Sequence, residues 1–336
     1  MSSINLMRKE AIEKRKSFLK THVDCKSTNC LQLSYRGDAA LEQGYLSTRF
    51  GQIHYTAAGN GSIVLLIHQS GRSSRMFLEL IGVLSDRFRA VAIDLPGFGN
   101  SAPAEAGITI EDLADLCAEV IVALGADAAH VYGHHSGNKI AAALAGRHPD
   151  RVKRLVLAGQ SHSIIPDQVA RNKAIDKFVR PYRQSAEMCD ARALKAEKWA
   201  RTYRTIASAW WQPEILSDAT PHAEALAHAL VLDTLQAADG SAKLYAANLN
   251  YDLASGYRAI PVETLVLEIV TPEEDALIGR QGGAVCALIR NSELAEIEHE
   301  DGDGITLEGS ARELAEILIP FLSDNRPSQI KGAVQY

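Results

Sequence analysis

The stretch that most constrains this fold is residues 130–145, HVYGHHSGNKIAAALA. A short run of β-branched and aromatic residues passes directly into an Ala-rich helical pattern, and Gly133 and Gly137 flank the junction. The pattern predicts a strand, a sharp turn and a helix. Small residues two positions before and after the central His135 let the two backbones approach, while His135 takes a strained conformation with its side chain above the sheet.

Strand-like and helix-like segments alternate on both sides of this junction, which predicts right-handed crossovers and a mainly parallel sheet covered on both faces. Functional side chains are then expected at the carboxyl ends of the strands. The expected elements are a hairpin over 45–58, a strand from 63, a helix over 74–86, a strand from 90, a helix over 110–124, strands before 135 and before 157, a strand over 261–270, a strand over 292–298 and a helix over 308–322.

The junction resembles the nucleophile elbow of α/β-hydrolases, Gly-X-nucleophile-X-Gly, with His135 in the nucleophile position. Three further segments resemble this family in the same order. They are IVLLIHQSG (63–71), similar to a strand and its oxyanion loop, AVAIDLPGFGNS (90–101), similar to the next strand and its Asp-x-Pro-Gly-x-Gly-x-Ser turn, and RHPDRVKRLVL (147–157). The resemblance covers most of 45–160 and implies an α/β-hydrolase fold with an inserted helical cap.

The resemblance also implies a division of the chain. We expect a core formed by 45–163 and 257–324, and a helical cap over 164–256, where Ala, Arg and aromatic residues are frequent and strand patterns are absent. Residues 1–44 are expected to form an amino-terminal helical arm and 325–336 a tail. The arm's amphipathic pattern suits packing beside the core or between subunits, so a homodimer is one expectation.

The composition limits which classes of partner and which cellular location we expect for this chain. A formal net charge of −6 gives no reason to expect nucleic acid or an anionic membrane as a partner. No apolar run approaches the ~20 residues that span a bilayer, and the amino terminus has no apolar signal region. The five cysteines lack zinc-site spacing and are expected to be reduced thiols in a cytoplasmic protein. The alternative is a disulfide between Cys25 and Cys30 in an oxidising compartment.

The candidate site departs from the family. The resemblance implies a Ser, Asp or Cys nucleophile at the elbow, an acid after a late strand, and a His in the last loop. Here the elbow holds His135, and the last loop reads IEHEDGDGITLE (297–308). Aligning Gly302 with the family's glycine places Asp303 where the base normally lies, and His299 precedes it by four residues.

The hypothesis is therefore an inverted arrangement. His135 is the general base or, as a weaker alternative, the nucleophile, and Asp303 orients its ring. The backbone N–H groups of Gln69 and Ser136 form the oxyanion hole. In another alternative, Ser136 is itself the nucleophile, but sliding the elbow by one residue gives up the flanking glycines.

This arrangement suits hydrolysis of a small carbonyl compound, an ester, a lactone or a C–C bond, and hydrolysis is the leading expectation because it dominates the fold that the sequence resembles. A lyase, isomerase or cofactor-free oxygenase on the same fold is the alternative among enzymes, and a non-catalytic small-molecule-binding protein is the alternative outside them. No cofactor is expected, because the chain has neither a phosphate-binding loop nor a dinucleotide fingerprint. No metal is expected, because the adjacent His134 and His135 lack a third ligand at helical spacing.

Other polar and aromatic residues are candidates for binding substrate. His68 either faces substrate or bonds the backbone near the oxyanion loop, and Arg72 either pairs with a substrate carboxylate or anchors to Asp94. The acidic turn Glu273, Glu274 and Asp275 lies near the family's acid position. The substrate-binding candidates are His68, Arg72, His162, Trp210 and Trp211.

Overall fold

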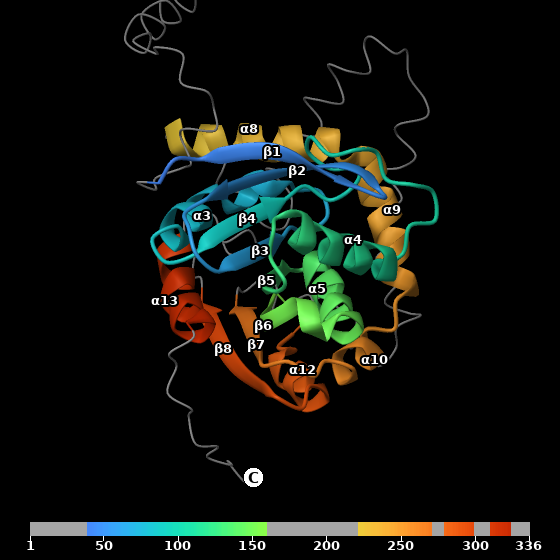
Figure 1. Ribbon diagram of the computed structural model, residues 1–336, viewed down its shortest axis with the longest axis vertical. Coiled ribbons are helices and arrows are strands. Elements are labelled where there is room, and N and C mark those ends of the chain that lie inside the picture. The colour runs from blue at the N-terminus through green and yellow to red at the C-terminus, as the bar shows by residue number, and fades with distance from the viewer. Residues whose placement is uncertain (1–38, 160–220, 271–278, 299–309, 324–336) are drawn as a thin grey trace, which may run out of the picture.

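The computed structural model describes residues 39–159, 221–270, 279–298 and 310–323 (Figure 1). Its strands are β1 (Glu42–Thr48), β2 (Gly51–Ala58), β3 (Ile63–Ile67), β4 (Arg89–Ile93), β5 (Ala129–His134), β6 (Val152–Ala158), β7 (Thr264–Val270) and β8 (Ser292–Glu298). Its helices are η1 (Ser74–Phe77), α3 (Leu78–Leu84), α4 (Ile110–Ala123), α5 (Ser136–Arg147), η2 (Pro149–Arg151), α8 (Pro221–Gln236), α9 (Ala238–Asn250), α10 (Leu253–Arg258), α12 (Gly282–Leu288) and α13 (Ala311–Leu322).

The eight strands form one sheet in the order β1-β2-β4-β3-β5-β6-β7-β8. Strand β2 pairs antiparallel with β1 and with β4, and every pair from β4 to β8 is parallel. The predicted α/β-hydrolase fold is confirmed. Because the parallel strands point the same way, their carboxyl ends meet at one edge of the sheet, where the elbow and the loop after β3 lie side by side.

Helices cover both faces of the sheet, so the central strands are apolar throughout. All five residues of β3, IVLLI, are buried, as parallel strands between two helical layers require. On one face α4, α5, α10 and α12 close a core, and on the other α3 and α13 close a second (Figure 1). Helix α4 begins at a capping box between Thr109 and Asp112, which satisfies its first backbone N–H groups.

The edge strand β1 is different, because it is buried on one side only. Its residues alternate between exposed and half-buried, and the ring of Tyr45 is half exposed to solvent. The strand begins at Glu42, three residues before the predicted start of the core. The hairpin with β2 turns at Gly51, whose φ of 97° is one that L-residues rarely adopt.

Helices α8 and α9 fall within the predicted cap. Helix α9 begins against the turn after β4, where Gly240 and Gly97 are so close that a Cβ at position 240 would lie 2.3 Å from the Gly97 carbonyl oxygen. Helix α10 crosses the predicted end of the cap, and it packs against α5 in the core. Of the predicted helical arm (1–44) only residues 39–44 are described, and Glu42–Gly44 form the start of β1 and not a helix. The rest of the arm, the tail and the rest of the predicted cap lie outside the described residues.

Two further observations concern the described residues alone. None of their helices is both long and apolar enough to cross a membrane. Cys117 is a buried free thiol and Cys286 a partly buried one, while the other three cysteines lie outside the described residues.

Candidate active site

His135 occupies the apex of the elbow. Its φ of 45° and ψ of −108° are strained, and among the described non-glycine residues it alone has a positive φ. Its N–H donates to the Ala158 carbonyl (2.9 Å), and its own carbonyl accepts from the N–H of Asn138 (3.0 Å). The strain therefore falls on the residue that the sequence pattern placed at the centre of the turn.

The flanking glycines are required by the close approach of backbones. A Cβ at Gly133 would lie 2.4 Å from the Gly137 carbonyl oxygen, and a Cβ at Gly137 would lie 2.4 Å from the Ile67 carbonyl oxygen. Helix α5 thus crosses β5 and β3 with no room for a side chain. The alternative register, with Ser136 at the apex, does not fit this geometry.

The ring of His135 lies over the end of β6. A Cβ at Gly159 would be 2.8 Å from His135 Nε2, so a bare glycine makes room for the imidazole. Gly159 itself is tied to β7 through its N–H, which donates to the Leu267 carbonyl at 3.1 Å. The amide of the buried Asn138 lies 3.4 Å from the Gly159 carbonyl and accepts a 2.9 Å bond from the hydroxyl of Tyr257. The floor under the imidazole is therefore fixed by α5, β7 and α10.

The neighbouring His134 has a different environment. It is fully buried, and its Nδ1 lies 3.0 Å from the hydroxyl of Tyr132, whose ring it stacks on. The rings of His134 and His135 meet edge to face, with centroids 4.8 Å apart. Within the part of the chain that the structure describes, no cluster of three or more His, Cys, Asp or Glu side chains could hold a metal ion.

The loop after β3 meets the elbow through Ser70. The N–H of Ser70 donates to Ser136 Oγ at 2.6 Å, although the two residues are 66 positions apart in the chain. The carbonyl of Gln69 is occupied by the His68 ring (2.7 Å) and the N–H of Arg72 (3.3 Å). The loop amide observed facing the elbow is thus that of Ser70, one residue beyond the predicted Gln69. The direction in which the Ser70 N–H points depends on the path of the loop, and the residue types alone do not specify that path.

His68 holds this loop to the next one. It is completely buried, its Nδ1 donates to the Gln69 carbonyl, and its Nε2 accepts from the N–H of Leu95 at 3.0 Å. Burial lowers the pKa of His68, and the bond to Gln69 opposes that effect only in part. With both ring nitrogens bonded to backbone, the geometry supports the structural alternative for His68 and corrects the prediction that it binds substrate.

Arg72 is buried against helix α8. Only 3% of its surface is exposed, and its Nε lies 3.4 Å from the carboxylate of Asp233 on α8. Asp233 was not among the predicted partners of Arg72, which were a substrate carboxylate and Asp94. A lone aspartate in the middle of a helical pattern gives no sequence signal that it will meet a loop 161 residues away.

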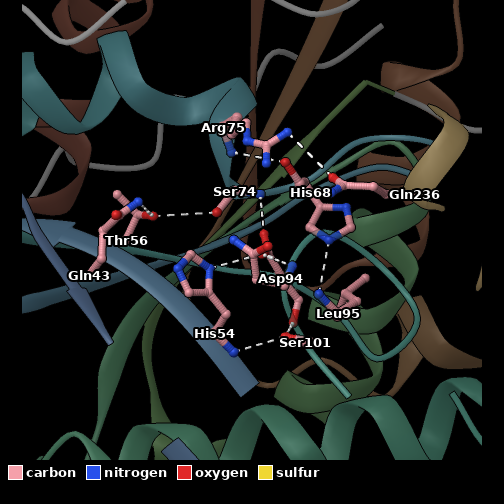
Figure 2. A network of polar contacts seen from close by, with 12 residues as sticks. Gln43, His54, Thr56, His68, Ser74, Arg75, Asp94, Leu95, Ser101 and Gln236 are labelled. Carbon is pink, nitrogen blue, oxygen red and sulfur yellow. Dashed lines mark hydrogen bonds and ion pairs between the residues drawn. The ribbon is translucent and has the colours of Figure 1, made fainter. Parts of the chain in front are cut away.

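Asp94 instead organises the turn after β4 (Figure 2). Its carboxylate lies 2.9 Å from His54 Nδ1 and accepts from the backbone N–H groups of Ser74 (2.7 Å) and Asn100 (2.9 Å). Burial would raise the pKa of Asp94, but these hydrogen bonds prevail and lower it to about 2. The carboxylate therefore stays charged and fixes the two loops that border the elbow.

A family model described as the alpha/beta hydrolase fold matches residues 62–256, more than half of the chain. The chain belongs to the α/β-hydrolase fold family. Its match to this family begins just before β3 and includes the elbow, the loop after β3 and the residues of the predicted cap.

Several relatives of this α/β-hydrolase-fold protein are hydrolases. The chain is 36% identical to haloalkane dehalogenase 2 of Mycobacterium tuberculosis over 118 residues, 35% of this chain and 41% of the relative. It is 32% identical to carboxylesterase YbfK of Bacillus subtilis over 165 residues, 47% of this chain and 51% of the relative. The chain spans about a third to a half of the length of the curated relatives it matches.

Solved structures show the same fold over more of the chain. The enol-lactonase from Burkholderia xenovorans LB400 superposes with a TM-score of 0.63 at 20% identity, covering 83% of this chain and 99% of that one. At this identity the likeness establishes the architecture alone.

The remaining predicted site residues fall elsewhere. Asp303, His162, Trp210 and Trp211 lie outside the described residues, as do His299 and the acidic turn 273–275, so their roles stay predictions. A groove of about 500 Å³ lies between α9 and the start of α4. Its lining contains none of the predicted site residues, and the elbow does not reach it.

Proposed function

We propose that this protein hydrolyses a small carbonyl compound, an ester, a lactone or an activated C–C bond, with His135 as the general base. The observation that carries this proposal is an imidazole at the strained apex of the elbow, beside a loop amide and the start of α5. The relatives, which include a carboxylesterase and a haloalkane dehalogenase, favour hydrolysis over other chemistry on the same fold.

In the proposed reaction His135 removes a proton from water while the water oxygen attacks the substrate carbonyl. The carbonyl oxygen becomes an oxyanion, and collapse of the tetrahedral intermediate expels the leaving group, which receives the proton from the imidazolium. The charge on the oxyanion needs preorganised donors. Ser136 N–H, at the amino-terminal end of α5, is one donor, and the helix dipole adds to it.

The Ser136 hydroxyl is the second donor in this proposal. It already accepts the N–H of Ser70, and a hydroxyl that accepts in this way keeps one hydrogen to donate. The loop thus acts on the oxyanion through Ser136, and in this proposal the Ser136 hydroxyl takes the place first expected for the N–H of Gln69. Asp303 remains the proposed partner that orients the imidazole.

General base action suits the position of the ring better than direct attack. Nε2 of the His135 imidazole is buried and lies beside Gly159. The cover of the ring must open for any reactant to reach this nitrogen, and a water molecule needs a smaller opening than a carbonyl carbon that approaches along the nitrogen lone pair. Base catalysis through water therefore ranks above an acyl-imidazole intermediate.

The experiment is turnover on a panel of p-nitrophenyl esters, lactones and β-diketones in water labelled with oxygen-18. Wild type should place one labelled oxygen in the acid product. His135→Ala should lower kcat/KM by about 10²–10⁴-fold, the usual contribution of a general base. Ser136→Ala should lower it by about 10²-fold through loss of one oxyanion donor.

The same assay separates the alternatives. If Ser136→Ala abolishes turnover while His135→Ala keeps it, Ser136 is the nucleophile and the proposal is wrong. Products without labelled oxygen would indicate a lyase or isomerase, and dependence on dioxygen would indicate an oxygenase. A compound that binds and is recovered unchanged would favour a binding protein.

A further inference from the structure

The loop after β3 and the first turn of η1 bind one buried carboxylate from the predicted cap. Asp233 on α8 is fully buried, and its carboxylate accepts from Ser73 Oγ at 2.7 Å and from Arg75 Nη1 at 3.1 Å. Arg72 Nε lies 3.4 Å from the same carboxylate. Three residues of one short segment, Arg72, Ser73 and Arg75, thus converge on a single acid from a helix that is distant in sequence.

These contacts begin two residues after the amide that meets the elbow. Ser70 donates to Ser136 Oγ, and the N–H of Arg72 closes the turn on the Gln69 carbonyl. On its other side the loop is fixed to the core, where Ser74 N–H donates to Asp94. The loop is therefore held between a core carboxylate and a cap carboxylate.

A second contact joins the same two elements. Arg75 Nη1 lies 3.5 Å from Gln236 Oε1, and Gln236 lies three residues along α8 from Asp233. Figure 2 shows the side chains of Arg75 and Gln236 reaching toward each other above the Asp94 network. Helix α8 thus meets the loop at more than one residue, and Asp233 is the fully buried centre of the joint.

We propose that Asp233 is a positioning residue for the reaction at the elbow. Its charge keeps Arg72 and Arg75 folded inward, and this fixes the loop in the path that aims Ser70 N–H at Ser136. This inference rests on the proposed hydrolysis for its effect on rate, but the effect on the loop stands by itself.

The physical reason is the cost of a buried charge without its partner. Arg72 and Asp233 are both buried, so neutralising Asp233 would remove the charge that faces the Arg72 guanidinium and that also accepts from Ser73 and Arg75. With this carboxylate neutral, the three side chains would hold their positions less tightly, and the loop would shift with them. A shift of about 1 Å in a group that positions the reaction can lower the rate by about 10²-fold.

The test compares Asp233→Asn with Asp239→Asn in the full chain. Asp239 is an exposed acid in the first turn of α9, where it pairs with Lys243, so its variant removes a cap carboxylate that does not touch the loop. Hydrogen–deuterium exchange should speed up in peptides covering 68–76 of Asp233→Asn and stay unchanged in those covering α4. The Asp239→Asn variant should exchange like wild type throughout.

Kinetics supply the second readout, with p-nitrophenyl acetate as the probe. Asp233→Asn should lower kcat by about tenfold or more and change KM by less than about twofold, because the misplaced donor acts in the transition state. Adding Arg72→Met to Asp233→Asn should restore part of the exchange protection, since the guanidinium that faced the lost carboxylate is then gone as well. If Asp233→Asn fails to fold, Arg75→Gln, at a half-buried contact, makes the same comparison.

The outcomes separate this inference from the proposed function. Unchanged exchange at 68–76 in Asp233→Asn would overturn the inference. Faster exchange with unchanged kcat would also overturn the positioning role and leave hydrolysis standing. Faster exchange in a protein that hydrolyses nothing in the panel would confirm the hold on the loop while contradicting the proposed function.

Discussion

His135 is held in a backbone conformation that an L-residue rarely adopts, with φ at 45°. Such strain costs on the order of 1–3 kcal/mol, and glycine avoids most of it because it has no Cβ. We predict that His135→Gly unfolds with a free energy about 1–3 kcal/mol higher than that of His135→Ala.

Both variants lack the imidazole, so urea unfolding of the pair measures the backbone strain alone. Equal stabilities would mean that the elbow relaxes when the ring is removed. At an unstrained helical position alanine is the better residue, so the sign of the difference is itself diagnostic.

Gly159 is predicted to be as important to the site as the histidine it supports. Its φ is 62°, and a Cβ there would lie within 3 Å of the His135 ring. Gly159→Ala should lower turnover by displacing the ring. It should also destabilise the protein by more than Gly107→Ala, where φ is 76° and nothing lies within 4 Å of the added Cβ.

The comparison isolates the ring contact, because both substitutions carry the cost of a positive φ, about 1–2 kcal/mol. Denaturant unfolding and turnover on the same ester should both single out Gly159→Ala. Equal losses of stability, with activity kept, would show that the imidazole does not depend on the bare glycine.

At this scale the sequence predicts what local pattern determines. The spacing of Gly133 and Gly137 around His135 is enough to locate the elbow, because only glycine lets the strand and helix backbones approach each other so closely. The roles of Ser70 and Asp233 could not be predicted. The first depends on which way one loop amide turns, and the second on a contact across 160 residues or more.

The elbow works as a junction between elements, since α5 lies directly on β5 and on the end of β3. We predict that Gly137→Ala destabilises the protein by about 1–3 kcal/mol, the usual cost of overpacking, because the new Cβ meets backbone that cannot rotate away. Gly283→Ala in α12 is the matched control, because nothing lies within 4 Å of its Cβ.

The control should stabilise the protein by roughly 0.5–1 kcal/mol, since alanine suits a helix better than glycine does. Thermal or urea unfolding of both variants checks the pair. A neutral Gly137→Ala would mean that α5 is not held against β3 as closely as the structure places it.

Element boundaries follow the sequence where one face of an element is apolar. Strand β8 begins and ends as predicted over 292–298, where the more buried Ala295 and Ile297 alternate with exposed residues. The helix expected over 74–86 is instead the 3-10 helix η1 followed by α3, which ends at Leu84. Ser73 caps the first turn, since its side chain accepts from the N–H of Arg75. Strand β1 extends beyond its predicted start because edge pairing with β2, rather than burial, sets its length.

For the molecule as a whole, the order of strands and helices determines the parallel sheet, and its carboxyl edge gathers the loops of the site. The resemblance to a family added two predictions to this pattern, a helical cap and a catalytic role for the elbow. The substrate-facing surface was harder to predict, because buried candidates such as His68 and Arg72 serve to join loops. Polar residue types alone do not distinguish a ligand contact from a satisfied buried bond.

The Asp94 network joins β2, β4 and η1, so its charge state affects the stability of the whole molecule. The folded pKa of Asp94 is about 2, against an ordinary value of 3.8. The resulting stabilisation, on the order of 2 kcal/mol, is present above pH 4 and is lost as the pH falls through about 2.

We therefore predict that wild type is more stable than Asp94→Asn at pH 7 and that the gap narrows between pH 4 and pH 2. Urea unfolding across this range measures it, with the exposed Asp150→Asn as the control that shows no such trend. A gap that stays constant with pH would mean that Asp94 contributes through hydrogen bonding and not through charge.

The most direct test of the central claim, that the elbow imidazole performs the chemistry, is chemical rescue of His135→Gly. Glycine keeps the backbone of the turn and leaves a space where the ring was, so the assay is ester hydrolysis by this variant with and without added imidazole. The account predicts little turnover alone and a saturable recovery with imidazole that follows the fraction of neutral base as pH rises. Full turnover by His135→Gly without imidazole would contradict it.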